Sequence, residues 1–264
     1  MNITSRDNSL LRHARAVRDG KETDSIFVEG LRLCEEAVRS NLKIEAVIYS
    51  DRIAQKDRAT KVIHELEELA QKSASVSEQL LASISYTKTP QGIIVLASRP
   101  TITEKEFAGR QANTPLLVIL HRISNPVNLG AILRTAEAAG ATGALTTAGT
   151  TDPFAPKSLR GAMGAAFRLP IWTDVDYSRA VEWCRKRSIQ TVCAEVEATQ
   201  TYDEVDWRQP TALILGAESA GLSTEEIAAA REAIRIPMKG STESLNVAVA
   251  AGILLYEAHR QREW

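Results

Sequence analysis

The stretch LLVILHRISNPVNLGAILRTAEAAGATGALTT (116–147) contains an apolar run, a helical pattern and a second apolar run in direct succession. The runs LLVIL (116–120) and GALTT (143–147) are short and rich in aliphatic or β-branched residues, which is typical of buried strands. Between them, NLGAILRTAEAAG (128–140) begins at an asparagine and stops at a glycine, and it therefore predicts a helix. A strand, a helix and a strand in this order predict two parallel strands joined by a crossover helix.

The same alternation continues toward the C-terminus. Further buried strands are predicted at IQTVCAE (189–195), TALILG (211–216) and AIRIP (233–237). Ser223 and Glu226 form a capping box that predicts the start of another helix. We therefore expect an α/β fold in this half, with a mostly parallel sheet and helices on both of its faces.

A last helix is expected from about Ser244 to Arg260. Its apolar residues recur at helical spacing, namely Leu245, Val249, Ile253 and Tyr256. The small residues of VAVAAGILLYEA (247–258) suit close packing against a second copy of the chain, and an ordinary internal core explains the same pattern.

A polar stretch, SRPTITEKEFAGRQANT (98–114), separates this half from the preceding one. We predict a smaller α/β domain over residues 1–98, a linker over 99–113 and a larger α/β domain over 114–264. In the first domain, strands are expected at 25–30, 45–50 and 92–98, and helices at 31–41 and 61–73.

Composition excludes several classes of protein. The 264 residues include 32 Lys+Arg and 33 Asp+Glu, so the net charge of −1 gives no sign of a nucleic-acid-binding protein. No apolar run approaches the ~18–20 residues that span a bilayer, and the N-terminus lacks the apolar stretch of a secretory signal. The three cysteines, Cys34, Cys184 and Cys193, are odd in number and fit free thiols in a reducing compartment. We therefore expect a cytoplasmic protein with no membrane partner.

Three unusual loops follow predicted strands of the second half. They are SNPVNLGAILRTA (124–136), LGAESAGLS (215–223) and IPMKGSTESLNVAVA (236–250). Singly, each is explained by ordinary helix caps and turns. Because all three leave the carboxyl ends of strands, where ligands bind in open parallel sheets, we expect them to share one pocket.

The missing motifs narrow the chemistry of that pocket. The chain contains no dinucleotide-binding glycine fingerprint, no phosphate-binding P-loop and no nucleophile elbow. No metal site is expected, because the four histidines are far apart and none has a partner at metal-ligand spacing. His121 follows a strand directly, and a loop histidine without a catalytic task is the favoured interpretation over a catalytic residue.

NPVNLGAILRTAEAAG (125–140), LILGAESAGLS (213–223) and IRIPMKGSTESLNVAVAAGILLYEA (234–258) resemble the three signature motifs of the SpoU (TrmH) family of RNA 2′-O-methyltransferases, which belongs to the SPOUT superfamily. The resemblance has the family's motif order and covers about residues 114–264.

Upstream segments resemble the ribosomal-protein L30e-like RNA substrate-binding domain that precedes the catalytic domain in many of these enzymes. The segments are SRDNSLLRHARAVRD (5–19), FVEGLRLCEEA (27–37) and TKTPQGIIVLA (87–97). Motif by motif this second resemblance is weaker, although it lies where the family would have it.

The resemblance implies a parallel sheet whose C-terminal segment forms a trefoil knot, and a homodimer whose active sites receive residues from both protomers. It implies S-adenosylmethionine as methyl donor and cofactor, with no metal. The implied cofactor contacts are Leu215, Gly216, Ile236, Met238 and Leu245.

Arg134 matches the arginine of the family's first motif and is the catalytic residue that the resemblance implies. Asn128 and Glu218 would hold it, while Ser244 and Asn246 would shape the site where ribose meets the methyl donor. The family's arginine is often described as the base for the 2′-hydroxyl proton. Since a guanidinium group is not deprotonated in proteins, we favour a cationic arginine that stabilises a developing alkoxide.

Three positions depart from many relatives. His121 and Asn125 stand where an aspartate is common, and Ser219 stands where a glycine is common. None of these departures involves Arg134 or Glu218, so an active enzyme is the leading hypothesis, most plausibly in processing of 23S-type ribosomal RNA. A transfer RNA methyltransferase and a catalytically inactive SPOUT-fold assembly factor are the alternatives.

Charge is less even along the chain than in total. Arginines at 12, 15 and 18 recur at helical spacing, which is typical of a basic stripe facing phosphates and equally of a solvated helix face. The predicted RNA contacts are Arg12, Arg15, Arg18, Arg32, Lys157 and Arg160.

Overall fold

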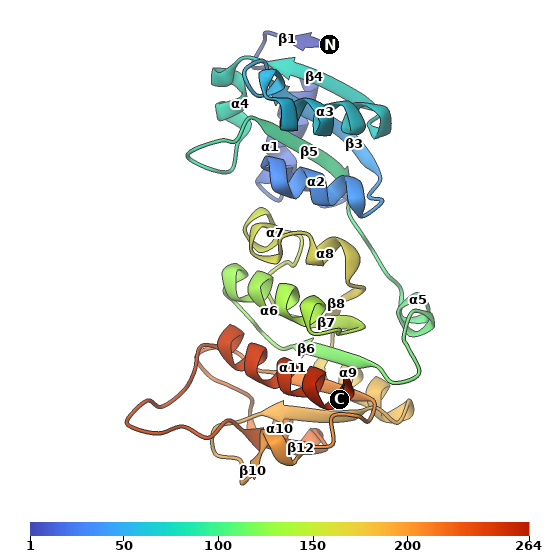
Figure 1. Cartoon of the computed structure of the whole chain (residues 1–264), viewed down its shortest axis with the longest axis vertical. Coiled ribbons are helices and arrows are strands. Elements are labelled where there is room, and N and C mark those ends of the chain that lie inside the picture. Colours follow the sequence, from blue (N-terminus) through green and yellow to red (C-terminus); the bar gives the residue numbers. More distant parts are fainter. Residues whose placement is uncertain (264) are drawn as a thin grey trace. The chain divides into compact units, whose positions relative to one another are not determined.

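The computed structural model describes residues 1–263, which fold into two compact units (Figure 1). The first unit comprises Met1–Pro100 and Phe154–Arg168. The second comprises Thr101–Pro153 and the chain from Leu169 onward.

The first unit is built on a five-stranded mixed sheet within the described residues, in the order β1-β4-β3-β5-β2. Strands β1, β4 and β3 run parallel, whereas β5 is antiparallel to both β3 and β2. Its elements are β1 (Asn2–Ile3), α1 (Ser9–Arg18), β2 (Ser25–Glu29), α2 (Leu31–Arg39), β3 (Ile44–Ser50), η1 (Ile53–Gln55), α3 (Asp57–Leu69), β4 (Lys72–Val76), α4 (Glu78–Ile84), β5 (Ile93–Ser98), α7 (Pro156–Ala162) and α8 (Ala165–Arg168).

The helices α7 and α8 are distant in sequence from the rest of this unit. Helix α7 contacts β2, and Arg168 at the end of α8 forms an ion pair with Glu36 on α2. Gly164, between the two helices, lies so close to Glu36 that a Cβ there would be 2.7 Å from its carboxylate. These contacts explain why residues 154–168 cluster with the first unit, although they follow strands of the second.

The second unit contains a seven-stranded sheet within residues 101–263, in the order β10-β12-β9-β11-β6-β7-β8, and every pairing in it is parallel. The predicted α/β fold with a mostly parallel sheet is thus confirmed. Its elements are α5 (Glu104–Gly109), β6 (Leu116–Leu120), α6 (Pro126–Ala138), β7 (Gly143–Thr147), β8 (Ile171–Val175), α9 (Tyr177–Lys186), β9 (Gln190–Ala194), β10 (Gln200–Thr201), η2 (Tyr202–Glu204), β11 (Thr211–Leu215), α10 (Thr224–Ala229), β12 (Glu232–Arg235) and α11 (Val247–Glu263).

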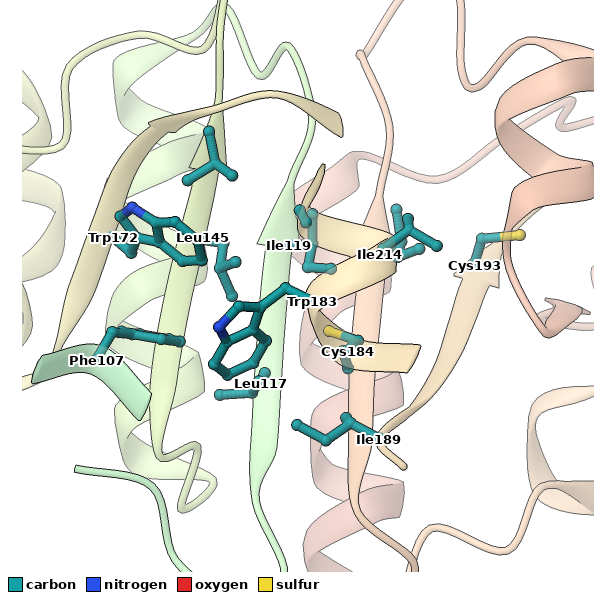
Figure 2. Close-up of a cluster of buried hydrophobic side chains, with 14 of the residues drawn as sticks. Phe107, Leu117, Ile119, Leu145, Trp172, Trp183, Cys184, Ile189, Cys193 and Ile214 are labelled. Atoms are coloured by element: carbon teal, nitrogen blue, oxygen red, sulfur yellow. The ribbon is translucent and has the colours of Figure 1, made fainter. Parts of the chain in front are cut away.

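Side chains bury both faces of this sheet. Leu117 and Ile119 point into a cluster that contains Phe107, Trp172 and Trp183 (Figure 2). The three aromatic rings lie 5.5–6.0 Å apart between centroids, in tilted and edge-on arrangements. The alternate residues of β6 are also fully buried, and α6 and α11 pack against each other on the other side of the sheet (Figure 1).

Helix boundaries differ from the predicted ones where side-chain caps decide them. Helix α6 begins at Pro126 rather than at Asn128, because the Asn125 side chain accepts a hydrogen bond from the Val127 amide and caps it. Helix α11 begins at Val247 rather than at Ser244, and the Asn246 side chain accepts from the Ala248 amide at 2.9 Å. The predicted capping box of Ser223 and Glu226 is confirmed at the start of α10.

The apolar residues of α11 divide between two faces. Leu254 and Leu255 are buried with Ala251 and Ala258, whereas Val249 and Tyr256 are 52% and 51% exposed. None of the four residues noted at helical spacing in the sequence, Leu245, Val249, Ile253 and Tyr256, is buried, so that spacing marks the exposed side of the segment and not its core. No helix within residues 1–263 is long and apolar enough to cross a membrane.

The segment expected to be a linker contains part of the core. Helix α5 begins with a capping box of Thr103 and Glu106. Its Phe107 is fully buried against Trp172 and Trp183. Capping and burial together explain why this polar stretch is ordered as a helix.

Replacing Phe107 by alanine should therefore lower the free energy of unfolding of the second unit by about 3–5 kcal/mol, because it leaves a cavity among aromatic rings. Denaturant unfolding followed by tryptophan fluorescence measures this. Lys105→Ala, at an exposed position of the same helix, is the control and should change it by less than about 0.5 kcal/mol. Equal, small effects of both substitutions would contradict the structural role of this segment.

Candidate functional site

A cavity of about 550 Å³ opens in the second unit at the carboxyl edge of the sheet. Strands β12, β9 and β11 are neighbours in the sheet, and residues that follow each of them line the cavity. The start of α6 contributes Asn128, and the segment before α11 contributes Ser244, Leu245 and Asn246. The three loops singled out in the sequence thus meet at one cavity.

The cavity contains most of the residues predicted for the site. All five predicted cofactor contacts line it, and so do four of the five predicted catalytic residues, Asn128, Glu218, Ser244 and Asn246. Its volume falls within the ~300–1,000 Å³ usual for small-molecule sites.

One part of the cavity lining was not predicted from the sequence. Ala194, Glu195 and Val196 line it at the end of β9, and Arg235 lines it at the end of β12. The signal was present, because 189–195 was predicted as a strand of the same sheet and its following loop had to emerge at the same edge.

The wall formed by residues 216–222 is mostly main chain. Gly216 lies so close to the loop's return that a Cβ there would be 2.9 Å from the Gly221 carbonyl carbon. Gly221 has φ +62° and donates its amide to the Ala217 carbonyl at 2.9 Å. A side chain at either glycine would open this turn, so the tight loop leaves backbone groups to face a ligand.

Glu218 connects this loop to the beginning of α6. One carboxylate oxygen accepts hydrogen bonds from the Ser124 amide and hydroxyl, both at 3.1 Å. The other accepts from the Asn125 amide at 3.2 Å and from the Asn128 side-chain amide at 3.1 Å. A carboxylate with four donors at a helix N-terminus is favoured in its ionised form.

The ionisation of Glu218 reflects a balance of two effects. Partial burial raises the pKa of its carboxyl group, but the hydrogen bonds from Ser124, Asn128 and Asn125 outweigh it and hold the pKa below the ordinary value of 4.5. Asn128 extends the connection, since its side-chain oxygen accepts from the Asn246 side chain at 3.2 Å. Glu218, Asn128 and Asn246 therefore join the loop after β11, α6 and the start of α11.

Arg134 lies away from the cavity. It is exposed on α6, and within residues 1–263 no hydrogen bond joins it to Asn128 or Glu218. That these two residues hold Arg134 therefore stays a prediction. On a helix, six residues separate Asn128 from Arg134 by ~9 Å and about 240° of rotation, which directs the two side chains to different faces. Val127, seven residues before Arg134 and 48% exposed, shares its face instead.

The predicted RNA contacts lie in the first unit and fall into two groups. Arg15 donates to the Arg6 carbonyl at 2.9 Å, and Arg18 donates to the Ser83 and Ser85 carbonyls and pairs with Asp19. These two arginines are half-buried and donate to main-chain carbonyls around α1, so the basic stripe along this helix stays a prediction. The exposed members are Arg12, Arg32, Lys157 and Arg160.

Titratable side chains elsewhere in the described residues give no metal centre. Within residues 1–263 no three His, Cys, Asp or Glu side chains are grouped so as to hold a metal ion. The cysteines are buried and unpaired, and burial raises the pKa of Cys193 to about 11, which disfavours the reactive thiolate.

The family profile described as the SpoU rRNA methylase family matches residues 115–256, and the profile of the MRM3-like substrate binding domain matches residues 11–95. An uncharacterized tRNA/rRNA methyltransferase of Synechocystis sp. is 31% identical, covering 98% of this chain and 94% of that protein. The 23S rRNA (guanosine(2553)-2′-O)-methyltransferase RlmP of Bacillus subtilis is 29% identical, covering 96% of this chain and 97% of that protein. The crystal structure of an AdoMet-bound rRNA methyltransferase from Sinorhizobium meliloti has a TM-score of 0.87 and 30% identity, covering 98% of this chain and 97% of that one.

The hydrogen bonds to Glu218 predict a pH-dependent contribution to stability. Since its pKa in the folded protein lies below 4.5, the contribution is complete above that value and is lost as the pH falls through the folded-state pKa. Glu218→Gln should lower the free energy of unfolding by roughly 1 kcal/mol at neutral pH, a small value because the side chain is exposed.

Urea unfolding of both proteins at a series of pH values tests this. The difference between wild type and Glu218→Gln should shrink as the solution becomes more acidic than the ordinary carboxyl pKa. Glu243→Gln, an exposed glutamate of the loop before α11, is the matched control. A difference that stays constant with pH would contradict the prediction.

Proposed function

The chain belongs to the SpoU rRNA methylase family, and from this membership we infer that it is an S-adenosylmethionine-dependent RNA ribose 2′-O-methyltransferase. We propose ribosomal RNA of the 23S type as its substrate. The support is that the RlmP relative is named for 23S rRNA and matches nearly the whole of this chain, including the part that precedes the family domain.

The observation that carries the proposal is the meeting of the three sequence motifs at one cavity. The family profile covers the first two motifs and the third as far as residue 256. The cavity is lined by main-chain-rich loops and by the charged or polar side chains of Glu195, Glu218, Arg235, Asn128 and Asn246. Main-chain amides and carbonyls can match the donors and acceptors of adenine, while Leu215 and Met238 offer apolar walls.

The residues of the cavity fit S-adenosylmethionine in size and chemistry. We propose that Gly216, Ile236 and Leu245 bind it through backbone groups and that Leu215 and Met238 pack against it. When bound, the cofactor supplies an activated methyl group, so the protein's own contribution is mainly alignment. Glu218, Asn128 and Asn246 keep the loops in place, and we propose that Ser244, which lines the same cavity, helps to shape the place of the ribose.

Arg134 is proposed to act on the ribose from a second protomer. It shares an exposed face of α6 with Val127 and lies outside its own chain's cavity. A guanidinium group there would stay cationic, stabilise the developing 2′-alkoxide, and leave the proton to a phosphate oxygen or water.

The exposed apolar residues of α6 and α11 support a homodimer. Val127, Val249 and Tyr256 are 48–52% exposed on two helices that pack against each other. Apolar side chains gathered on neighbouring helices are typical of an interface between copies.

We also propose the trefoil knot, RNA binding by the first unit and a cytoplasmic location. Two observations support the knot. Residues of the loops 216–223 and 236–246 line one cavity. After β12 at one side of the sheet, the chain passes β9 and β11, and α11 packs on α6. RNA contacts are assigned to the exposed Arg12, Arg32, Lys157 and Arg160. The location follows from the proposed ribosomal substrate.

Arg134→Ala should lower methyl transfer from tritiated S-adenosylmethionine to undermodified ribosomal RNA by about 10²–10³-fold, because one transition-state charge contact is lost. Binding of S-adenosylhomocysteine should be unchanged, because Arg134 does not line the cavity. A parallel assay with transfer RNA distinguishes the two substrate classes. Label that does not depend on Arg134, or no label in any RNA, would contradict the assignment.

Arg134→Lys distinguishes two hypotheses for this residue, a cationic stabiliser of the alkoxide and a general base. A cationic stabiliser predicts reduced activity with an unchanged pH profile, since lysine lacks the planar pair of donors. Near wild-type activity with a pH profile that follows lysine ionisation would instead support a general base.

Val249→Asp should convert the protein from a dimer of 28.9 kDa chains to a monomer and abolish methyl transfer. Sedimentation equilibrium measures the mass. Leu69→Asp, at a 52% exposed position of the first unit, is the control and should leave the dimer intact. A monomeric wild-type protein that methylates RNA would contradict the proposed shared site.

A further inference from the structure

A buried group of polar side chains lies behind the cavity wall, and the proposed reaction assigns it no role. His121 is 2% exposed and follows β6, Thr147 is 3% exposed at the end of β7, and Glu226 lies in the first turn of α10. We call these three residues the His121 network. None of them lines the cavity.

Each polar atom of the network has a partner. His121 Nδ1 is 2.9 Å from Thr147 Oγ1, and His121 Nε2 is 3.0 Å from Glu226 Oε1. The Arg122 guanidinium also donates to Glu226 Oε1, and the Ser223 amide donates to Glu226 Oε2 at 2.8 Å.

The ionisation of Glu226 fixes the hydrogen positions. Burial raises the pKa of its carboxyl group, but the hydrogen bond from the Ser223 amide, the charge of Arg122 and the hydrogen bond from the His121 ring outweigh burial and hold the pKa below its ordinary value. An ionised carboxylate only accepts, so His121 Nε2 carries the hydrogen.

Burial in turn lowers the pKa of His121, in spite of the opposing charges of Glu226 and Asp176, so the ring is neutral and its Nδ1 accepts from the Thr147 hydroxyl. Thr147 Oγ1 accepts in turn from the Arg122 amide at 3.3 Å. Every donor then meets an acceptor.

His121 holds both ends of the cavity wall. Its main-chain amide donates to the Leu215 carbonyl at 2.9 Å, immediately before the wall begins at Gly216. Its ring donates to Glu226 in the first turn of α10, four residues after the wall ends at Leu222. His121 therefore contacts the chain on both sides of the wall, at Leu215 and at Glu226.

Helix α10 has few other anchors. It has six residues and none of them is buried, so packing alone fixes it weakly. The Tyr177 hydroxyl donates to the Glu226 carbonyl at 2.7 Å, and the Tyr177 ring lies 4.6 Å from the His121 ring between centroids. Tyr177 thus supports the same point of α10 and the same histidine.

We propose that His121 is a positioning residue for the cofactor, which acts through its hydrogen bond to Glu226 by fixing the shape of the wall 216–222. The proposal rests on the proposed cofactor site. It predicts that loss of this hydrogen bond weakens cofactor binding and leaves the methyl-transfer step itself almost unchanged.

Two substitutions of His121 distinguish the effect of its hydrogen bond on cofactor binding from the effect of its packing. In His121→Gln the side-chain amide can still donate to Glu226 from about the position of Nε2, whereas His121→Leu has no donor and fills similar space. Isothermal titration with S-adenosylhomocysteine should give a Kd raised about tenfold in the Leu variant and within about twofold of wild type in the Gln variant. Steady-state kinetics should show the same split, with KM for S-adenosylmethionine raised and kcat retained.

Several results would overturn the proposal. Equal increases of Kd in both variants would assign the effect to lost packing on Tyr177, and unchanged Kd in a folded Leu variant would remove the role altogether. If His121→Leu shows no cooperative thermal transition, Thr147→Val is the variant to measure. Valine has nearly the shape of threonine but lacks the hydroxyl that donates to His121 Nδ1, and the Kd for S-adenosylhomocysteine should rise about threefold. Unchanged Kd there counts against the proposal.

The same titration separates this inference from the proposed function. Wild-type protein that fails to bind S-adenosylhomocysteine would refute the cofactor site itself. Wild-type binding together with unaffected variants would refute only the role of His121.

Discussion

The site depends on one carboxylate that joins two neighbouring loops. Glu218 accepts hydrogen bonds from the Ser124 and Asn125 amides and from the Asn128 side chain, and it does so from the loop that follows β11. The two amides directly precede α6, which begins at Pro126, and the Asn128 side chain belongs to its first turn. These hydrogen bonds fix the loop after β11 and the start of α6 relative to each other, and residues of both line the cavity.

The parallel sheet makes this arrangement possible. Because β12, β9, β11 and β6 are consecutive neighbours, their following loops emerge side by side, and segments more than a hundred residues apart share one cavity. The same order leaves Arg134 on the outer face of α6, beside exposed apolar side chains. Within one chain, the cavity and the Arg134 side chain therefore lie apart.

The strands of the second unit and most of the cavity lining could be predicted from the sequence, because short apolar runs are typical of buried strands. LLVIL and GALTT coincide with β6 and β7, and the loops after the strands contain the lining residues. Contacts at long range could not be predicted: the Glu226 partner of His121 is 105 residues away, and Phe107 looks like part of a polar linker until the tryptophans that cover it are in place. β4 has only two buried apolar residues, Ala74 and Val76, with Ser75 between them, which is too few to stand out.

The most direct test of the central claim, that this chain methylates ribose in ribosomal RNA, is a map of 2′-O-methyl groups in RNA from cells that lack the gene. We expect at least one ribosomal nucleotide to lose its methyl group in these cells. It should regain the group when the wild-type gene is restored, but not when the Arg134→Ala gene is. An unchanged map of ribosomal RNA, or a change confined to transfer RNA, would contradict it.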